Sequence, residues 1–306
     1  MSTTGSRTSA VNATPPTGAV IITGCSTGLG LEMAMHLAGQ GMAVYATVRD
    51  PNHEEEVFKE AEARGVKVKV LRLDLTDHPT VHAAVAQAAE EAGGIFALIN
   101  NGGIGLRGCI EDTTPEEIRR LFEANIVGTV EVTKAVLPYM REAKKGRIVT
   151  ITSVGGRVST YGVGLYCASK FAQEGMAEAL YLEMAPFGLQ SIIIEPGIIK
   201  TTRWDENRGE AVNAGNADSP YHRYFTQSEA IADQLVQRSK TKPEDVAVAV
   251  HKALTVENPK LRYVVGKPAA AVIMARRLLP NRLFERLYFG GFLRSIEMRA
   301  AKAPVG

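Results

Sequence analysis

The sequence has few of the residues that build disulfide frameworks and none of the long apolar runs that span membranes. Its three cysteines are widely spaced and odd in number, which argues against a disulfide framework and fits a reducing compartment, so we expect a cytoplasmic protein. No run approaches the roughly 18–20 apolar residues that a membrane-spanning helix needs. Residues 1–17 are rich in Ser, Thr and Pro and lack the apolar segment of a signal peptide, so they are predicted to form a disordered leader.

A large excess of charge of one sign is also missing. The formal net charge is +2 at pH 7, which gives no electrostatic case for a nucleic-acid partner, because that would need a clustered basic face. The histidines show no metal-site pattern. His78 and His82 stand four residues apart, but neither a third ligand nor the glutamate of a metalloprotease accompanies them. We predict no metal site.

What the chain does contain is a regular alternation of two kinds of segment. Strands are expected at 19–23, 42–48, 67–73, 95–100, 146–152, 189–195 and 261–266. Helices are expected at 28–40, 53–64, 79–92, 164–187 and 115–143, the last as one bent helix or as two joined near Gly128. Strands this apolar, alternating with helices, predict an α/β fold, namely a Rossmann-type doubly wound parallel sheet with helices on both faces.

We expect one domain over residues 18–266. The polar segment 198–242 breaks the alternation and is interpreted as a substrate lid, because long irregular insertions in compact domains are usually functional or disordered. Residues 267–306 are expected to form a C-terminal helical extension. Within it, apolar residues recur at helical spacing among arginines, which indicates a helix packed over the substrate pocket or on a second subunit. Weak contact with a membrane surface is the second interpretation.

A glycine-rich stretch, "TGCSTGLG" at 23–30, follows the first predicted strand and opens the first predicted helix. Gly24, Gly28 and Gly30 allow a sharp turn that brings backbone N–H groups close to a pyrophosphate at the helix N-terminus. A generic tight turn is the alternative. The order of strand, glycines and helix favours dinucleotide binding.

A tyrosine and a lysine stand four residues apart in "GLYCASKFAQEG" at 164–175. On a helix this spacing puts Tyr166 and Lys170 on one face. Alone the pair could equally be an ordinary surface pair. Ser153, however, follows the fifth predicted strand thirteen residues before Tyr166. Because ligands bind beyond the carboxyl ends of parallel strands, these residues and the glycine loop should reach the same crevice.

Taken in order, these motifs resemble the short-chain dehydrogenase/reductase family over residues 18–266. The matching motifs are "TGCSTGLG" at 23–30, "LDL" at 73–75, "NNGG" at 100–103, Asn125, "TSVGG" with Ser153, "YCASK" at 166–170 and "PGIIKT" at 196–201. The segments "VYATVRD" and "YCASKFAQEG" are most similar to the 17β-hydroxysteroid and retinol dehydrogenase branch.

The resemblance implies a catalytic role for four residues. Tyr166 would be the general acid that protonates a carbonyl oxygen as hydride arrives from a nicotinamide, or the base in the reverse direction. Lys170 would lower the pKa of Tyr166 and hydrogen-bond the nicotinamide ribose. Ser153 would donate to the substrate oxygen, and Asn125 would hold a water in a proton relay toward Lys170.

The resemblance also implies a set of cofactor contacts. Asp74 matches the position that contacts the adenine, with a turn cap as its other interpretation. Gly103 stands where the family usually has alanine, and it keeps close backbone approach to the cofactor with more local flexibility. The full predicted set is Gly24, Ser26, Thr27, Gly28, Leu29, Gly30, Arg49, Asp74, Leu75, Asn101, Gly102, Gly103, Tyr166, Lys170, Pro196, Gly197, Ile198 and Thr201.

The end of the second strand distinguishes NADP from NAD. An acidic side chain there binds the ribose 2′-OH of NAD, whereas an arginine accommodates the 2′-phosphate of NADP. Here Val48 is expected to end the strand and Arg49 follows it, while Asp50 precedes Pro51 and is typical of the start of a turn. We favour NADP(H), with NAD(H) as the alternative.

The resulting expectation is an NADP(H)-dependent interconversion of a bulky hydrophobic ketone and its secondary alcohol. By resemblance the protein is a homodimer or homotetramer that associates through the helices at 115–143 and 164–187. A polyketide-like natural-product ketoreductase is the alternative. A sugar-nucleotide epimerase or dehydratase on the same fold, or a non-catalytic NADP-sensing protein, is less favoured.

Overall fold

Seven parallel strands form a single sheet in the computed structural model, which describes residues 17–200 and 209–302. The strands are β1 (Ala19–Ile22), β2 (Ala43–Val48), β3 (Lys69–Arg72), β4 (Ile95–Asn100), β5 (Gly146–Ile151), β6 (Leu189–Pro196) and β7 (Arg262–Val265). Their order is β3-β2-β1-β4-β5-β6-β7, so the direction of winding reverses between β1 and β4. Nearly all of the predicted leader and Thr201 lie outside the described residues.

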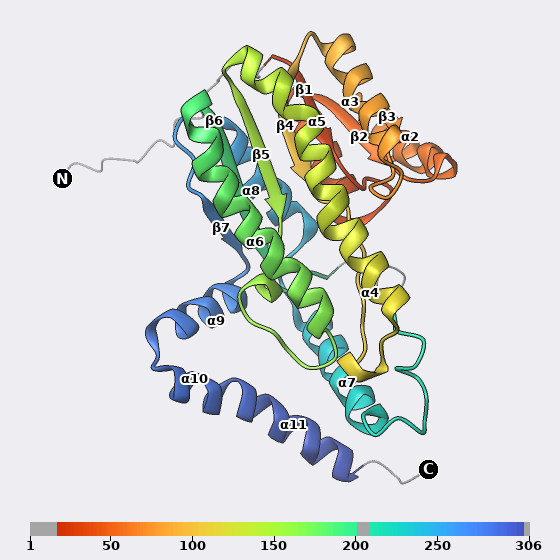
Figure 1. The fold of residues 1–306 in the computed structure, drawn as a ribbon, viewed down its shortest axis with the longest axis vertical. Helices are drawn as coiled ribbons and strands as arrows, with labels where there is room; N and C mark the ends of the chain where they lie inside the picture. The colour runs from red at the N-terminus through yellow and green to blue at the C-terminus, as the bar shows by residue number, and fades with distance from the viewer. Residues whose placement is uncertain (1–16, 201–208, 303–306) are drawn as a thin grey trace, which may run out of the picture.

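Helices cover both faces of this sheet (Figure 1). They are α1 (Gly28–Gly39), α2 (Glu54–Ala63), α3 (His78–Ala92), α4 (Pro115–Phe122), α5 (Gly128–Ala143), α6 (Gly164–Met184), α7 (His222–Arg238), α8 (Pro243–Thr255), α9 (Lys267–Leu278), α10 (Asn281–Leu287) and α11 (Phe289–Lys302). In β1, Val20 and Ile22 pack with residues of α1 and α8, while Ile21 packs with residues of α3 and α5. Both sides of the strands are thus buried, which is why they are apolar throughout. The predicted fold class is confirmed.

The long segment 115–143 is two helices joined by a π-helical turn, Glu123–Val127. Gly128 begins α5 directly beside the backbone that follows β3, and a Cβ at this glycine would lie 2.3 Å from the Leu75 carbonyl oxygen. Only glycine allows this approach. The turn places Asn125 at the junction of the two helices.

The two segments outside the sheet alternation pack together. The polar segment predicted as a lid contains α7, whose Phe225 and Val236 are buried, so it is more regular than its composition indicated. The C-terminal extension forms α9, α10 and α11, and α11 lies along α7 (Figure 1). Arg223 of α7 donates to the Ala300 carbonyl, and Arg299 donates to Gln234 at 2.8 Å.

Candidate active site

One cleft of about 2130 Å³ opens at the carboxyl ends of the strands. It is lined by every predicted catalytic and cofactor-binding residue that the structure describes, from Gly24 in the first loop to Ile198 after β6. Thr201 is the one predicted member outside the described residues. Ligand pockets usually measure about 300–1,000 Å³, so this cleft has room for a dinucleotide and for a second, bulky molecule.

The glycine loop after β1 is a tight backbone cradle. Gly24 and Gly28 have φ values of +71° and +61°, which side-chain-bearing residues rarely adopt. A Cβ at Gly30 would lie 2.1 Å from the Gly24 carbonyl oxygen, so α1 could not begin this close to the strand with any other residue. The cradle therefore fits the pyrophosphate of a dinucleotide, held at the N-terminus of α1.

Two polar side chains hold the cradle in place. Asn101 donates from Nδ2 to the carbonyl oxygens of Thr23 and Gly24, at 2.9 and 3.0 Å. The Thr23 hydroxyl accepts from the backbone N–H groups of Asn101 and Gly102, at 3.0 and 2.8 Å. The loops after β1 and β4 are thereby tied together where the sheet order reverses. Thr23 was missed at the sequence level, although it is the first residue of the glycine motif.

The two residues that follow β2, Arg49 and Asp50, both line the cleft. β2 ends at Val48, and Arg49 is exposed on the rim of the cleft. The Asp50 carboxylate accepts a hydrogen bond from the Asn52 N–H at 3.0 Å, and this bond holds the pKa of Asp50 below its usual range. Asp50 thus begins a turn, as expected.

Asp74 also caps a turn while it lines the cleft. Its carboxylate accepts from the backbone N–H and the hydroxyl of Thr76, at 2.9 and 2.8 Å. The turn-cap interpretation therefore holds, and the contact with an adenine stays a prediction. Leu75 packs so close to Gly102 that a Cβ on that glycine would lie 3.0 Å from the leucine side chain.

Ser153 and Tyr166 face one another across the base of the cleft. Ser153 lies two residues beyond β5, and its Oγ accepts from the Gly155 N–H at 3.0 Å, which leaves its own hydroxyl hydrogen to donate. Tyr166 lies in the first turn of α6. Burial raises the pKa of Tyr166 to about 12, although the hydrogen bond with Ser153 opposes the shift.

Lys170 is buried one turn further along α6. Its ammonium donates to the Ile151 carbonyl oxygen at 3.0 Å and to Gln173 Oε1 at 2.9 Å. Desolvation lowers the pKa of Lys170 to about 8. The nitrogen lies 5.8 Å from the centre of the Tyr166 ring. Burial and the Ser153 hydrogen bond are the main influences on the pKa of Tyr166 in this structure, and the lowering of that pKa by Lys170 stays a prediction.

Asn125 is fixed by the loop that follows β4. Its Oδ1 accepts from the Ile104 N–H at 2.8 Å, and its Nδ2 donates to the Ile104 carbonyl oxygen at 3.0 Å and to Ser169 Oγ at 3.1 Å. A Cβ at Gly103 would lie 2.8 Å from Asn125 Oδ1. Glycine at position 103, where the family usually has alanine, therefore leaves room for the Asn125 side chain. This steric reason for glycine adds to the local flexibility expected from the sequence.

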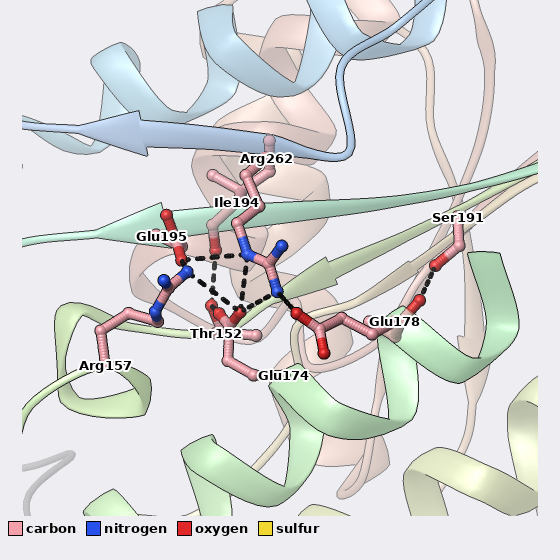
Figure 2. A network of polar contacts seen from close by, with 9 residues as sticks. Thr152, Arg157, Glu174, Glu178, Ser191, Ile194, Glu195 and Arg262 are labelled. Atoms are coloured by element: carbon pink, nitrogen blue, oxygen red, sulfur yellow. Dashed lines mark hydrogen bonds and ion pairs between the residues drawn. The ribbon is translucent and has the colours of Figure 1, made fainter. Parts of the chain in front are cut away.

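A network of ion pairs with two buried carboxylates connects α6, β6 and β7 (Figure 2). Glu174 of α6 accepts from the Thr152 hydroxyl at 2.6 Å and pairs with Arg262 of β7 at 3.1 Å. Glu195 of β6 pairs with Arg157 at 2.9 Å and with Arg262 at 3.5 Å. Burial, and after it the charge of Glu174, raises the pKa of Glu195. The network anchors α6 to the edge of the sheet, one turn from Lys170.

Part of the cleft lining is apolar. Leu106, Leu121 and Tyr161 belong to a small buried cluster there, and Tyr288 and Phe292 of the C-terminal extension also line the cleft. Tyr288 and Phe292 stand more than 100 positions after the three cluster residues in the sequence. The sequence indicated a helix over the pocket but not which of its residues reach it.

Within residues 17–200 and 209–302 there is no cluster of three or more His, Cys, Asp or Glu side chains able to hold a metal ion. In the same part of the chain no helix has the length and apolar character needed to cross a bilayer.

Comparison with known proteins places the chain among dehydrogenases. The family model described as short chain dehydrogenase matches residues 18–212. A 3-ketodihydrosphingosine reductase of Bacteroides thetaiotaomicron is 37% identical over 268 residues, which cover 87% of this chain and 94% of that protein. The 17-beta-hydroxysteroid dehydrogenase type 1 of Homo sapiens is 35% identical over 252 residues, which cover 80% of this chain and 76% of that protein.

A solved structure agrees with these matches. An actinorhodin polyketide ketoreductase with NADPH superposes with a TM-score of 0.67 at 28% identity, covering 85% of this chain and 94% of that one. The family model spans the glycine loop, Ser153 and the Tyr166–Lys170 pair, and these lie together in one cleft. The chain belongs to the short-chain dehydrogenase family and is an oxidoreductase that uses a nicotinamide cofactor.

Proposed function

We propose that the protein is an NADP(H)-dependent oxidoreductase that interconverts a bulky hydrophobic ketone and its secondary alcohol. The observation that carries this proposal is the cleft, because it is lined by the glycine loop, by Ser153, Tyr166 and Lys170, and in part by apolar side chains. The names of the relatives support it, since they describe enzymes of lipid, steroid and polyketide ketones.

Each residue has a definite task in this proposal. The bound cofactor supplies a hydride to the carbonyl carbon, or accepts one in the reverse direction. Tyr166 gives its phenolic proton to the carbonyl oxygen, and Ser153 donates a hydrogen bond to the same oxygen. With a pKa of about 12, Tyr166 is protonated at neutral pH and so is ready to act as the acid in ketone reduction.

The NADP(H) preference is proposed from the end of β2. Arg49 carries a positive charge on the rim of the cleft, while the Asp50 carboxylate is occupied by the Asn52 N–H. A guanidinium is well suited to a 2′-phosphate, with which it forms charge-assisted hydrogen bonds. We keep the cytoplasm as the proposed compartment, because all three cysteines are buried and unpaired.

Removing the proton donor tests the mechanism. Tyr166→Phe should lower kcat for ketone reduction by roughly 10²–10⁴-fold, the usual contribution of a general acid. NADPH affinity should change little, because the ring is kept. The assay follows NADPH absorbance with 3-ketodihydrosphingosine, steroid ketones and polyketide-like ketones as substrates. Unchanged turnover of every ketone that the wild type reduces would overturn the proposal.

Changing the charge at the end of β2 tests the cofactor preference. Arg49→Ala should weaken NADPH binding roughly 10- to 100-fold, since a charged hydrogen bond is lost, and should leave NADH binding nearly unchanged. Asp50→Asn is the matched control, because it keeps the turn while removing the negative charge. The affinities are measured by fluorescence titration. If Arg49→Ala weakens the binding of NADPH and NADH equally, Arg49 does not select the cofactor, and Asp50 becomes the candidate for that role.

We propose that two copies associate through α5 and α6. These helices expose Val130, Phe171, Tyr181 and Leu182, the last with 72% of its surface accessible, although apolar side chains of this size usually lie inside. Leu182→Glu should therefore reduce the mass in solution to that of one 32.9 kDa chain, as measured by light scattering. Phe58→Glu on α2 is the control and should leave the assembly intact. A monomeric wild type would refute this interface.

The outward side of the C-terminal helices fits an anionic lipid surface. Residues 267–302 carry eight basic and two acidic side chains, a net charge of +6 against +2 for the whole chain. In the same range, the apolar side chains of Leu278, Leu283 and Leu287 are exposed. We propose that these helices, besides closing the cleft, make weak contact with anionic membranes, where each basic residue contributes about 1 kcal/mol.

Vesicle flotation tests this contact. Phosphatidylglycerol vesicles should carry the wild-type protein upward, while phosphatidylcholine vesicles should not. Replacing Arg282 and Arg286 together by glutamate should abolish flotation, because the attraction becomes a repulsion. Replacing Lys59 and Lys67 by glutamate changes the total charge equally and should leave flotation intact. Equal loss in both double variants would show that only net charge matters.

A further inference from the structure

Gln173 joins Lys170 directly to Asn125. It lies on α6, three positions after Lys170, and only 1% of its surface is accessible. Its Oε1 accepts from the Lys170 ammonium at 2.9 Å, and its Nε2 donates to the main-chain carbonyl oxygen of Asn125 at 2.8 Å. No role for this glutamine follows from the family's motifs quoted above.

The orientation of the carboxamide is fixed by its two neighbours. An ammonium only donates hydrogen bonds, so it must face the amide oxygen. A main-chain carbonyl only accepts, so it must face the amide nitrogen. Asn125 lies in the π-helical turn, a type of turn that is frequent at functional sites because it disturbs the regular helical hydrogen bonds. The carbonyl that receives Gln173 therefore belongs to the special turn between α4 and α5.

We propose that Gln173 is a positioning residue for the reaction, holding the Lys170 ammonium in place and occupying the position that a relay water would otherwise take between Asn125 and Lys170. The inference rests on the proposed function, because the position of Lys170 affects the reaction only if Tyr166 beside it is the general acid. Gln173 itself does not touch the substrate oxygen.

The bridge has two chemical consequences. A neutral carboxamide has no proton that it can release near pH 7, so it holds Lys170 without carrying protons away from it. The ammonium has three N–H donors, and the contacts with Ile151 and Gln173 occupy two of them. The third is left for the ribose of the cofactor or for the Tyr166 hydroxyl. Gln173 thus determines where the remaining N–H donor of Lys170 points.

Gln173 also stabilises the charged form of Lys170. Two titratable groups on the same helix face this ammonium: the ring centre of Tyr166 lies 5.8 Å away, and the carboxylate of Glu174 acts on its charge. Glu174 in turn belongs to the network with Glu195 on β6, Arg262 on β7 and Arg157 after β5. Of these, Glu174 favours the charged form of Lys170, but it is shared with Arg262 and Arg157. A neutral acceptor at hydrogen-bond distance therefore adds to the support of the cation.

Two substitutions at this position should move the pKa of Lys170 in opposite directions. Gln173→Leu keeps much of the volume but removes the acceptor, so the pKa of Lys170 should fall by about one unit. Gln173→Glu keeps the shape and adds a negative charge, so the same pKa should rise by about one unit. The titration is followed by NMR of the lysine-labelled protein without cofactor, and Lys170→Met identifies the signal.

The rate of ketone reduction should change together with the pKa of Lys170. In Gln173→Leu, kcat for ketone reduction should fall about 10-fold with the KM for the ketone nearly unchanged, and the midpoint of the kcat–pH profile should move with the pKa of Lys170. Gln173→Ala should lose less than Gln173→Leu, because it leaves a polar space in which a water can bridge Asn125 and Lys170. Gln87→Leu on the exposed side of α3 is the control and should match the wild type.

The outcomes separate this inference from the proposed function. If Gln173→Leu and Gln173→Glu lose thermal stability while the pKa of Lys170 and the pH profile stay at the wild-type values, Gln173 is only structural and the inference is wrong. If the wild type reduces no ketone, the proposed function fails, while the NMR titration still decides whether Gln173 controls Lys170. Should Gln173→Leu not fold, the upward shift expected in Gln173→Glu decides the question alone.

Discussion

A buried ammonium is the feature on which the site depends. Taking the charge of Lys170 out of water disfavours it, and the pKa falls to about 8. The charge is kept because its partners come from fixed elements: the Ile151 carbonyl oxygen at the end of β5 and Gln173 on α6. Because Gln173 is in turn held by Asn125, the helix junction before α5 also takes part. The site is therefore assembled by the sheet and two helices together.

The ion-pair network of Figure 2 explains how α6 keeps its position against the sheet. Glu174 and Glu195 are both buried, and two carboxylates so close would destabilise the fold without the arginines between them. Arg262 contacts both carboxylates and thereby connects α6, β6 and β7. Breaking such a pair from one side typically costs about 3–5 kcal/mol, so the arrangement tolerates little movement of the helix that carries Tyr166 and Lys170.

The sequence predicted the strands, the helices before β6 and the glycine loop, because each of these has a local signal: apolar runs, amphipathic spacing and glycines at strand ends. It did not predict α7 or α8. Gln173 could not be found in this way. A glutamine on a helix has no special pattern, and its role arises only because the π-helical turn brings the Asn125 carbonyl to it. The burial that raises the pKa of Tyr166 could not be predicted either, although the helical spacing between Tyr166 and Lys170 is visible in the sequence.

The lining of the cleft is mixed in character. Ser153, Tyr166 and Lys170 supply polar donors, whereas Leu106, Tyr288 and Phe292 supply apolar surface. A molecule with one carbonyl oxygen and a large apolar body can satisfy both kinds of lining only when the oxygen points toward Tyr166. Under the proposed function, the chemistry depends on residues that the sheet positions, while α7 and α11 bring further side chains to the cleft that would contact the body of the substrate. Relatives that share the motifs can therefore differ in substrate.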